Sequence, residues 1–343
     1  MAVSTLWRRL LALDARAASF DSLGFAPCDA AVRARLEKVL ETFIQGYNLT
    51  LALDNPQLVA ATLRRQLDVH HVGFAFEGAG MAYALSDLLA PWRPSRLRGF
   101  LEGAGRDHDY IAAVGAGFAI ARVPWKRLLW PSFYRRLDPL VAWCVPDGYG
   151  FHEGIFRRRR YFEDRAEPPA WLPPFARQLF ASGLARSLWW SLGARPQPIA
   201  RAIGDFPAAR RPEMWCGIGV AAAYAGGAGE GALLELRGLA GPYRDDFLSG
   251  IPFATRMRQK GRNPSPVTGR ACELLLGIGA DEAADWLAAT VERVVADESV
   301  AREVRLRDSY LLVRRRLVED LNHSAQGEPP CRVPVPKITT ASS

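Results

Sequence analysis

Residues 76–82 read Phe-Glu-Gly-Ala-Gly-Met-Ala, and this mixture of small and apolar residues decides the fold. Related glycine-containing stretches return five more times along the chain. The first glycines of the six copies are Gly78, Gly115, Gly148, Gly183, Gly217 and Gly250. Successive copies lie 37, 33, 35, 34 and 33 residues apart. Because a period of about 34 residues is the length of one helix–turn–helix unit, the sequence predicts an all-α protein of tandem helical hairpins.

The glycines themselves predict close helix packing. A glycine inside a helix is roughly 1 kcal/mol less favourable than alanine, so repeated glycines need a compensating contact. A helix face without Cβ atoms can approach a neighbouring backbone closely, and Gly78 with Ala82 shows the four-residue spacing of one such face. We set aside a dinucleotide-binding role. Neither Gly115-Ala116-Gly117 nor Gly148-Tyr149-Gly150 completes G-x-G-x-x-G after a β-branched strand.

Helix start and stop signals divide the chain into three parts. Residues 1–29 form an N-terminal segment, residues 30–323 a single helical-repeat domain, and residues 324–343 a tail predicted to be flexible. Within the domain we expect helical hairpins wound into a solenoid or superhelix around a groove or cavity. The expected helices cover about residues 30–47, 56–67, 69–89, 95–104, 107–123, 137–145, 147–161, 175–192, 198–204, 212–225, 231–239, 245–260, 267–277, 281–296 and 305–321.

Composition places the chain among ordinary globular proteins. Of its 343 residues, 49% are apolar and 23% are charged, which is ample material for a core. No apolar run is long enough to predict a membrane span, and the N-terminus lacks the apolar stretch of a signal peptide. The five cysteines are widely spaced without a C-x-x-C pair, which argues against a disulfide framework and a cysteine zinc site. We therefore expect a cytoplasmic protein, with a peripheral membrane location as the alternative.

The net charge of +8 permits an anionic partner. Two basic runs stand out, Arg157–Arg160 and Arg314–Arg316. We expect each to be a solvated face or a helix C-terminus. The alternative is a docking site for an acyl carrier protein or an anionic membrane surface. The sequence holds no nucleic-acid-binding module, so we expect no nucleic-acid partner.

The residue before each first glycine is the main source of candidate site residues. Equivalent positions of a repeat protein tend to face the same way, and several of these positions are polar. Glu77 lies in a stretch of apolar and small residues from Val72 to Leu85, where an unpaired carboxylate is costly. We predict a catalytic or strong structural partner for it. Asp147 follows Pro146 and is predicted to cap a helix N-terminus, with a catalytic role as the alternative.

His152 and Glu153 complete the densest polar cluster of the sequence. A histidine beside a glutamate can serve acid–base catalysis or bind a metal, although adjacent helical residues point about 100° apart. A structural histidine, hydrogen-bonded between repeats, explains His152 equally well. The segment Arg106–Tyr110 could add metal ligands to His152, but an acid-rich helix N-terminus explains that segment better. We therefore predict catalytic roles for both residues and no metal or cofactor.

Aromatic residues near the repeated helices are candidates for the wall of a substrate pocket. Most aromatic residues in such positions belong to a core, but some can line a cavity for a lipid or polyene. The predicted pocket residues are Phe118, Tyr149, Trp189 and Trp215. No spacing in the sequence predicts a Ser-His-Asp or Cys-His nucleophile, or a phosphate-binding loop.

The glycine-containing motifs also resemble a known family. They are similar, over roughly residues 20–325, to the UnbL-type proteins, the domain of unknown function numbered 1702. The resembling segments are Glu77–Met81, Tyr110–Ala119, Asp147–Gly154, Trp215–Gly219 and Tyr224–Gly227. The resemblance implies that the gene lies in a bacterial gene cluster for an enediyne polyketide or a similar product. Neighbouring genes would encode an UnbV-type β-propeller-like protein and an UnbU-type membrane protein. It implies no catalytic residues.

Two functional hypotheses follow. The first is an accessory or tailoring enzyme of bacterial specialised metabolism that cyclises or isomerises a long apolar polyene or isoprenoid-like substrate without a cofactor. Glu77, Asp147, His152 and Glu153 would act there as acid–base or cation-stabilising groups. The second is a non-catalytic scaffold or carrier for a partner protein or an apolar intermediate. The expected protein partners are UnbV-type and UnbU-type proteins or an acyl carrier protein.

Overall fold

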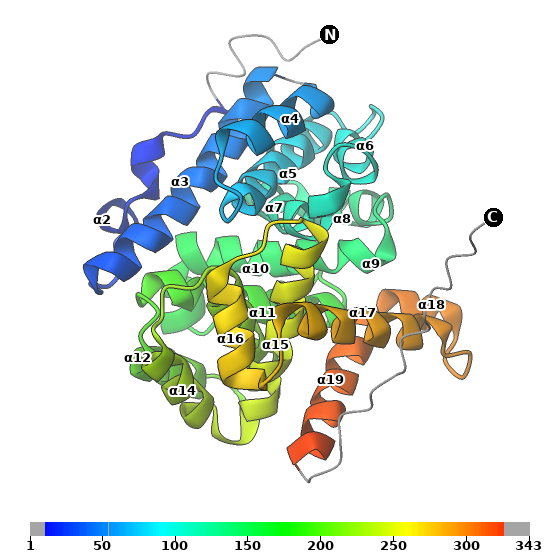
Figure 1. Cartoon of the computed structure of the whole chain (residues 1–343). Coiled ribbons are helices and arrows are strands. Elements are labelled where there is room, and N and C mark those ends of the chain that lie inside the picture. The colour runs from blue at the N-terminus through cyan, green and yellow to red at the C-terminus, as the bar shows by residue number, and fades with distance from the viewer. Residues whose placement is uncertain (1–10, 54, 326–343) are drawn as a thin grey trace, which may run out of the picture.

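A computed structural model describes residues 11–53 and 55–325, and these ranges are helical without a strand, as the sequence predicts (Figure 1). Residues 1–10 of the predicted N-terminal segment and residues 326–343 of the predicted tail lie outside the described residues. No described helix is long and apolar enough to cross a membrane. The α-helices are α2 (Phe20–Leu23), α3 (Ala30–Leu53), α4 (Pro56–Gln66), α5 (Val72–Leu89), α6 (Arg96–Glu102), α7 (Asp109–Arg122), α8 (Lys126–Tyr134), α9 (Pro139–Ala142), α10 (Cys144–Phe156), α11 (Pro174–Ser191), α12 (Pro196–Gly204), α13 (Arg211–Tyr224), α14 (Glu230–Leu239), α15 (Arg244–Lys260), α16 (Pro266–Leu276), α17 (Ala280–Ala296), α18 (Arg302–Arg307) and α19 (Ser309–Ala325).

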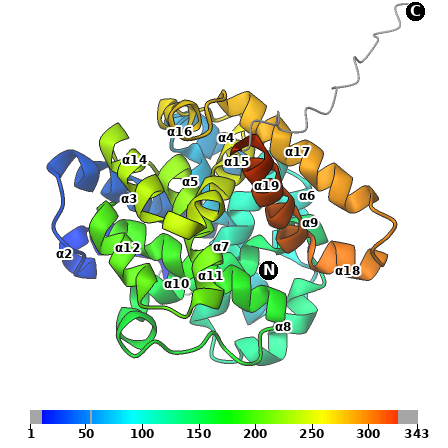
Figure 2. The same ribbon diagram turned by 90° about the horizontal axis from the view of Figure 1, so that it is seen from below.

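The long helices pack against one another in chain order. Helix α3 lies against α5, α5 against α7, α7 against α10, α10 against α11, α11 against α13, α13 against α15, and α15 against α17 (Figures 1 and 2). Helices α5, α7, α10, α11 and α13 are buried over most of their length. The connecting helices α4, α12, α14 and α16 bury one face only. The five helices that are buried over most of their length therefore form the core, and any internal site includes residues from them.

The row of long helices curves until its later members meet its first ones. Arg35 of α3 donates from Nε to the carbonyl oxygen of Ala225, just after α13, at 2.7 Å. Lys260 at the end of α15 forms a 2.5 Å ion pair with Asp109 at the start of α7. These contacts enclose the inward faces of the core helices. The cavities described below lie between those faces.

The recurring glycines lie where neighbouring helices touch. From the second copy onward, the first glycine of each copy packs against the backbone of the copy before it. It faces the carbonyl oxygen of the residue that stands just before that earlier copy's first glycine. The five pairs are Gly115 with Glu77, Gly148 with Val114, Gly183 with Asp147, Gly217 with Ser182 and Gly250 with Cys216. A Cβ atom at any of these glycines would overlap that carbonyl group. The predicted close approach of backbones at these glycines is confirmed.

One helix boundary differs from the prediction in a way that affects the candidate site. The helix predicted over residues 147–161 begins earlier, at Cys144, and ends at Phe156. Pro146 is tolerated because residues of the first helical turn need no intrahelical N–H bond. Asp147 therefore lies inside the first turn of α10, and its predicted role as the N-cap is wrong.

The sequence also failed to predict the short helices α2 and α8 and one break. Helix α8 contains Pro131, a residue that argues against a helix in sequence terms. The helix predicted over residues 305–321 is two helices, α18 and α19, separated at Asp308. Helix α19 begins separately at Ser309 and contributes to the candidate site.

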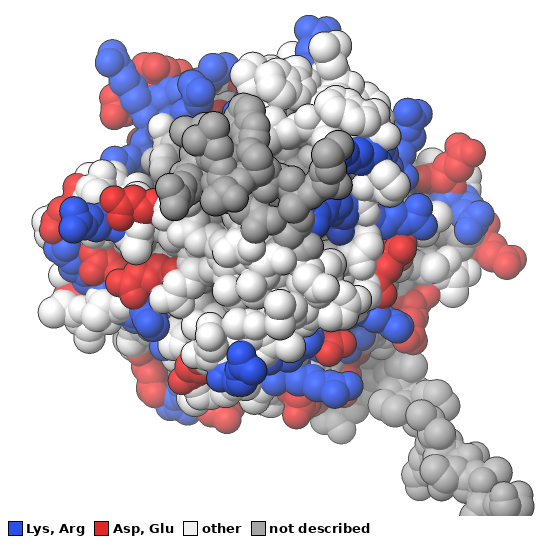
Figure 3. Space-filling view, turned by 90° about the horizontal axis from the view of Figure 1, so that it is seen from above, with Lys and Arg blue, Asp and Glu red and all other residues white. Residues whose placement is uncertain are grey.

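The basic runs are not both solvated faces. The Arg314 side chain is 15% exposed and forms ion pairs with Glu213 of α13 at 2.7 Å and Asp246 of α15 at 2.5 Å, so the solvated position expected for it is wrong. These pairs fasten α19 to two core helices. On the surface, both signs of charge lie around the rim of the face seen in Figure 3, and uncharged residues fill its centre. The positive excess is therefore not concentrated on that face.

Candidate functional site

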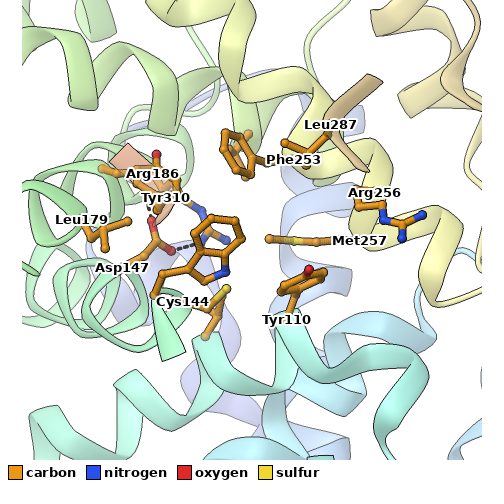
Figure 4. Close-up of a pocket in the computed structure, with 14 residues that line it drawn as sticks. Tyr110, Cys144, Asp147, Leu179, Arg186, Phe253, Arg256, Met257, Leu287 and Tyr310 are labelled. Carbon is orange, nitrogen blue, oxygen red and sulfur yellow. Dashed lines mark hydrogen bonds and ion pairs between the residues drawn. The ribbon is translucent and has the colours of Figure 1, made fainter. Parts of the chain in front are cut away.

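Two narrow cavities lie among the core helices, and the side chain of Arg186 lines both. The first, which we call the aromatic cavity, measures about 40 Å³ and is drawn in Figure 4. The residues that line it are Tyr110, Val114, Trp143, Cys144, Asp147, Leu179, Ser182, Arg186, Val220, Phe253, Arg256, Met257, Leu287 and Tyr310. They lie between the start of α7 and the start of α19, so segments far apart in the sequence must pack together to form this cavity.

Four aromatic side chains form a continuous wall of the aromatic cavity. The ring of Trp143 lies 6.1 Å from Tyr110, 5.8 Å from Phe253 and 5.3 Å from Tyr310, measured between ring centres. The contacts with Phe253 and Tyr310 are edge-to-face, an arrangement that stabilises aromatic pairs and fixes their orientation. This wall suits an apolar or planar group.

Asp147, Arg186 and Arg256 supply the charged groups of the aromatic cavity, and the first two pair with each other (Figure 4). The Asp147 carboxylate accepts a hydrogen bond from the Arg186 guanidinium and another from the Ser182 hydroxyl at 3.0 Å. Ser182 and Arg186 are four residues apart on α11 and therefore share one face of that helix. The side chains of Arg186 and Asp147 are only 4% and 13% exposed, so each charge depends on the other for compensation.

The second cavity, which we call the inner cavity, continues along the same helix faces. It also measures about 40 Å³. Val114 and Phe118 of α7 are four residues apart, as are Asp147 and Phe151 of α10, and the second of each pair lines the inner cavity. Since four residues are about one helical turn, the two cavities follow one another along the helix axes. The lining residues are Val39, Leu40, Phe43, Phe74, Glu77, Phe118, Phe151, Arg186, Trp190, Ala221, Tyr224 and Ala225.

Glu77 of α5 contributes the carboxyl group of the inner cavity. The residue is 4% exposed, and its Oε1 has no hydrogen-bond partner in the described part of the chain. Burial raises the pKa of Glu77 from 4.5 to about 8, while Arg186 lowers it and Asp147 raises it further. The carboxyl group is therefore mostly protonated at neutral pH. Arg186 thus pairs with Asp147 and is also near enough to Glu77 to influence the pKa of that carboxyl group.

A family model described as a protein of unknown function, DUF1702, matches residues 2–320. The chain belongs to the DUF1702 family. No curated protein and no solved structure matches it. Because the description of the DUF1702 family names no activity, function has to be argued from the cavities.

In this DUF1702 protein, His152 and Glu153 lie apart from the other two predicted catalytic residues. His152 is beyond Asp147 on α10, packs against the rings of Phe118 and Phe156 at 5.5 and 4.6 Å, and lines neither cavity. Burial lowers the pKa of His152, so the imidazole is neutral at physiological pH. Its Nδ1 lies 3.4 Å from Oε1 of Glu153. The fold brings these two side chains together, but not to the cavities.

Of the four predicted pocket residues, Phe118 lines the inner cavity. Tyr149, Trp189 and Trp215 are buried and line neither of the two cavities. Trp189 donates from Nε1 to the carbonyl oxygen of Gly226 at 2.7 Å, which is a structural contact. These three aromatic residues therefore belong to the packing between helices in this DUF1702 fold.

The segment Arg106–Tyr110, considered above for metal ligands, makes structural contacts. Asp109 pairs with Lys260 at 2.5 Å. His108 stacks on Phe76 with 4.1 Å between ring centres, and burial lowers its pKa to about 4. Across the described residues of this DUF1702 protein, no three His, Cys, Asp or Glu side chains gather where they could hold a metal ion.

Arg186 is the main site residue that sequence reasoning missed. It is the one charged residue of the stretch Phe180–Trp190, and it follows Ser182 by four residues, the spacing of one helix face. Those two facts together were a usable signal. Trp143 and Tyr310 carried no such signal, because only the packing of α19 against the core helices brings them together.

The raised pKa of Glu77 predicts how the variant Glu77→Gln changes stability with pH. Between pH 4.5 and about 8 the unfolded carboxyl group is ionised while the folded one keeps its proton, so the wild-type protein loses stability as the pH rises. The expected slope is about 1.4 kcal/mol per pH unit, and Glu77→Gln removes it. Urea unfolding of both proteins from pH 5 to 8 measures the difference between their free energies of unfolding. The contributions of other titrating groups cancel in that difference. Parallel stability curves would show that Glu77 ionises normally.

Proposed function

We propose that this protein binds a slender, conjugated apolar molecule along the two cavities and transfers a proton on it through Glu77. The observation that best supports this is the Glu77 carboxyl group itself. It is buried in an apolar cavity, has no hydrogen-bond partner in the described chain, and lies near the buried Arg186–Asp147 pair. Buried carboxyl groups with strongly shifted pKa values are typical of acid–base residues.

The properties of Glu77 favour isomerisation over cyclisation. A group with a pKa of about 8 exists in both forms near neutral pH and can accept a proton and return it. Cyclisation that begins with protonation of an isolated alkene needs a far stronger acid. In the proposed reaction a C–H bond next to a polarised double bond breaks, its electron pair forms a new double bond, and the proton returns at the far end. Arg186 would stabilise the negative charge that develops, and no oxidant is required.

The narrow cavities limit the shape of the substrate. Each has room for only a few water-sized groups, so a chain-like substrate would displace wall side chains such as Met257 and Leu287 when it binds. A planar polyene suits this space better than a bulky ring system. On the basis of the motif resemblance, we propose that such a reaction belongs to the tailoring of an enediyne polyketide or a similar bacterial product. The repeated glycine contacts support the interpretation of the helical hairpins as tandem repeats that build the cavities.

A carrier of an apolar intermediate is the second candidate. The mostly apolar lining of both cavities favours it, because such a lining suits an apolar ligand. A ligand held there would also satisfy the buried polar atoms without reacting. Deletion of the gene in its native host, complemented with wild-type protein or with Glu77→Gln, separates the two. The proposed isomerase predicts that the double-bond isomer of the product is lost and that Glu77→Gln does not restore it. Full restoration by a folded Glu77→Gln protein would leave only the carrier function.

A further inference from the structure

Four polar side-chain atoms of residues that line the inner cavity have no hydrogen-bond partner in the described chain. They are Oε1 of Glu77, Nε of Arg186, Nε1 of Trp190 and the hydroxyl oxygen of Tyr224. The four residues are 4%, 4%, 2% and 2% exposed. Buried polar atoms are nearly always hydrogen-bonded, and one left unpaired costs about 1–3 kcal/mol. Four such atoms around one cavity indicate a site for a ligand group that forms hydrogen bonds.

The four residues approach the cavity from three helices. Arg186 and Trp190 are four residues apart on α11 and share one helix face, so their N–H groups belong to the same wall. Glu77 lies on α5 and Tyr224 at the end of α13. The other lining side chains are aliphatic and aromatic, namely Val39, Leu40, Phe43, Phe74, Phe118, Phe151, Ala221 and Ala225. The two N–H donors of α11 therefore lie within a largely apolar lining.

The charges around the inner cavity determine which ligand group fits. Asp147 already compensates the charge of Arg186 through a direct hydrogen bond. A ligand carboxylate would add a negative charge that no free cation of the cavity lining balances, and such a buried charge is expensive. A neutral carbonyl oxygen accepts two hydrogen bonds and adds no charge. It is also small enough for a cavity of about 40 Å³.

We infer that the inner cavity binds the carbonyl oxygen of a conjugated ketone or aldehyde, which accepts hydrogen bonds from Arg186 Nε and Trp190 Nε1. The inference rests on the proposed function, because it places the apolar remainder of the same molecule in the aromatic cavity. The two donors polarise the carbonyl group and make the neighbouring C–H bonds more acidic. The substrate class is thereby narrowed from apolar polyenes to those that carry a neutral carbonyl group.

Three matched planar probes test the preference for a head group on the unaltered full-length protein. They are 4-phenylbut-3-en-2-one, cinnamate and 1-phenylbut-1-ene, which share a phenylalkene body and end in a ketone, a carboxylate and an alkyl group. Dissociation constants are measured by quenching of tryptophan fluorescence and by calorimetry. We expect the ketone to bind at least about tenfold more tightly than the other two. Its absorption band should also move to longer wavelength on binding.

The variants Trp190→Phe and Trp189→Phe form a matched pair on one helix. Trp190→Phe keeps an aromatic ring but removes the Nε1 donor, and should weaken ketone binding about tenfold without changing the binding of the hydrocarbon. Trp189 donates its Nε1 to Gly226 instead and does not line the cavity, so Trp189→Phe should leave both affinities unchanged. Circular dichroism and thermal unfolding confirm that each variant is folded.

The outcomes separate this inference from the proposed reaction. Equal binding of ketone and hydrocarbon, or no binding of any probe, would overturn the carbonyl site. Tighter binding of cinnamate would overturn it in favour of an anion site. A ketone preference that Trp190→Phe abolishes supports the inference, even if Glu77→Gln fully complements the deletion strain and the isomerase proposal fails. The preference of the wild-type protein is decisive by itself if Trp190→Phe does not fold.

Discussion

Replacing Asp147 with alanine is expected to destabilise the protein by about 3–5 kcal/mol. The substitution leaves the Arg186 guanidinium, whose side chain is 4% exposed, without the carboxylate that accepts its hydrogen bond. A buried unpaired charge is among the most costly changes that a single substitution can make. Denaturant unfolding at pH 7 with linear extrapolation measures the loss. A loss below about 1 kcal/mol would mean that water reaches Arg186 freely.

The double variant Asp147→Ala with Arg186→Met provides the control. It removes both charges and keeps a long apolar side chain at position 186, so most of the lost stability should return. Arg186→Met alone should also destabilise, because it leaves the Asp147 carboxylate with only the Ser182 hydroxyl as a partner. A double variant as unstable as the sum of the single variants would show that the two side chains do not interact.

Replacing Gly183 with alanine should destabilise the fold by about 3 kcal/mol, near the upper end of the usual range for overpacking. The new methyl group would overlap the backbone carbonyl of Asp147, and the backbone of α10 cannot move as a flexible side chain can. At Gly269, inside α16, a Cβ atom would meet no neighbouring atom within 4 Å, so Gly269→Ala should stabilise by about 0.5–1 kcal/mol. In thermal unfolding, we expect Gly183→Ala to lower the melting temperature and Gly269→Ala to raise it. Equal effects of the two variants would contradict the close approach at Gly183.

Helix content was predictable from the sequence because its signals are local. The helix predicted from residue 56, for example, does begin at Pro56, where the Asn55 side chain caps α4 by accepting a hydrogen bond from the Leu58 backbone. The glycine spacing correctly indicated close helix packing. The same local rules failed at Asp147, since a proline in the first helical turn allows the helix to begin before it.

The candidate site was predictable only where a residue conflicted with its local surroundings. Glu77 stood out as a carboxylate among apolar and small residues, and it lines the inner cavity. His152 was prominent for its chemistry, yet it packs against the rings of Phe118 and Phe156 and lines neither cavity. Tyr310 lies more than fifty residues after Phe253, and only the fastening of α19 by Arg314 brings the two rings to 5.1 Å. No local pattern carries that information.

The contacts between glycines and carbonyl groups also have a consequence for the evolution of the cavities. Glu77, Val114, Asp147 and Ser182 each press their backbone carbonyl against a glycine of the next helix, while their side chains line one of the cavities. Packing at these positions is thus carried by the main chain, and the side chain is left to contact the ligand. A lineage could exchange the side chains of Glu77 and Val114 to accept a new ligand while the framework between helices stays unchanged, whereas Asp147 and Ser182 also hold Arg186 and would have to change together with it. At Glu77 and Val114, ligand specificity and architectural stability would then evolve on separate atoms of the same residues.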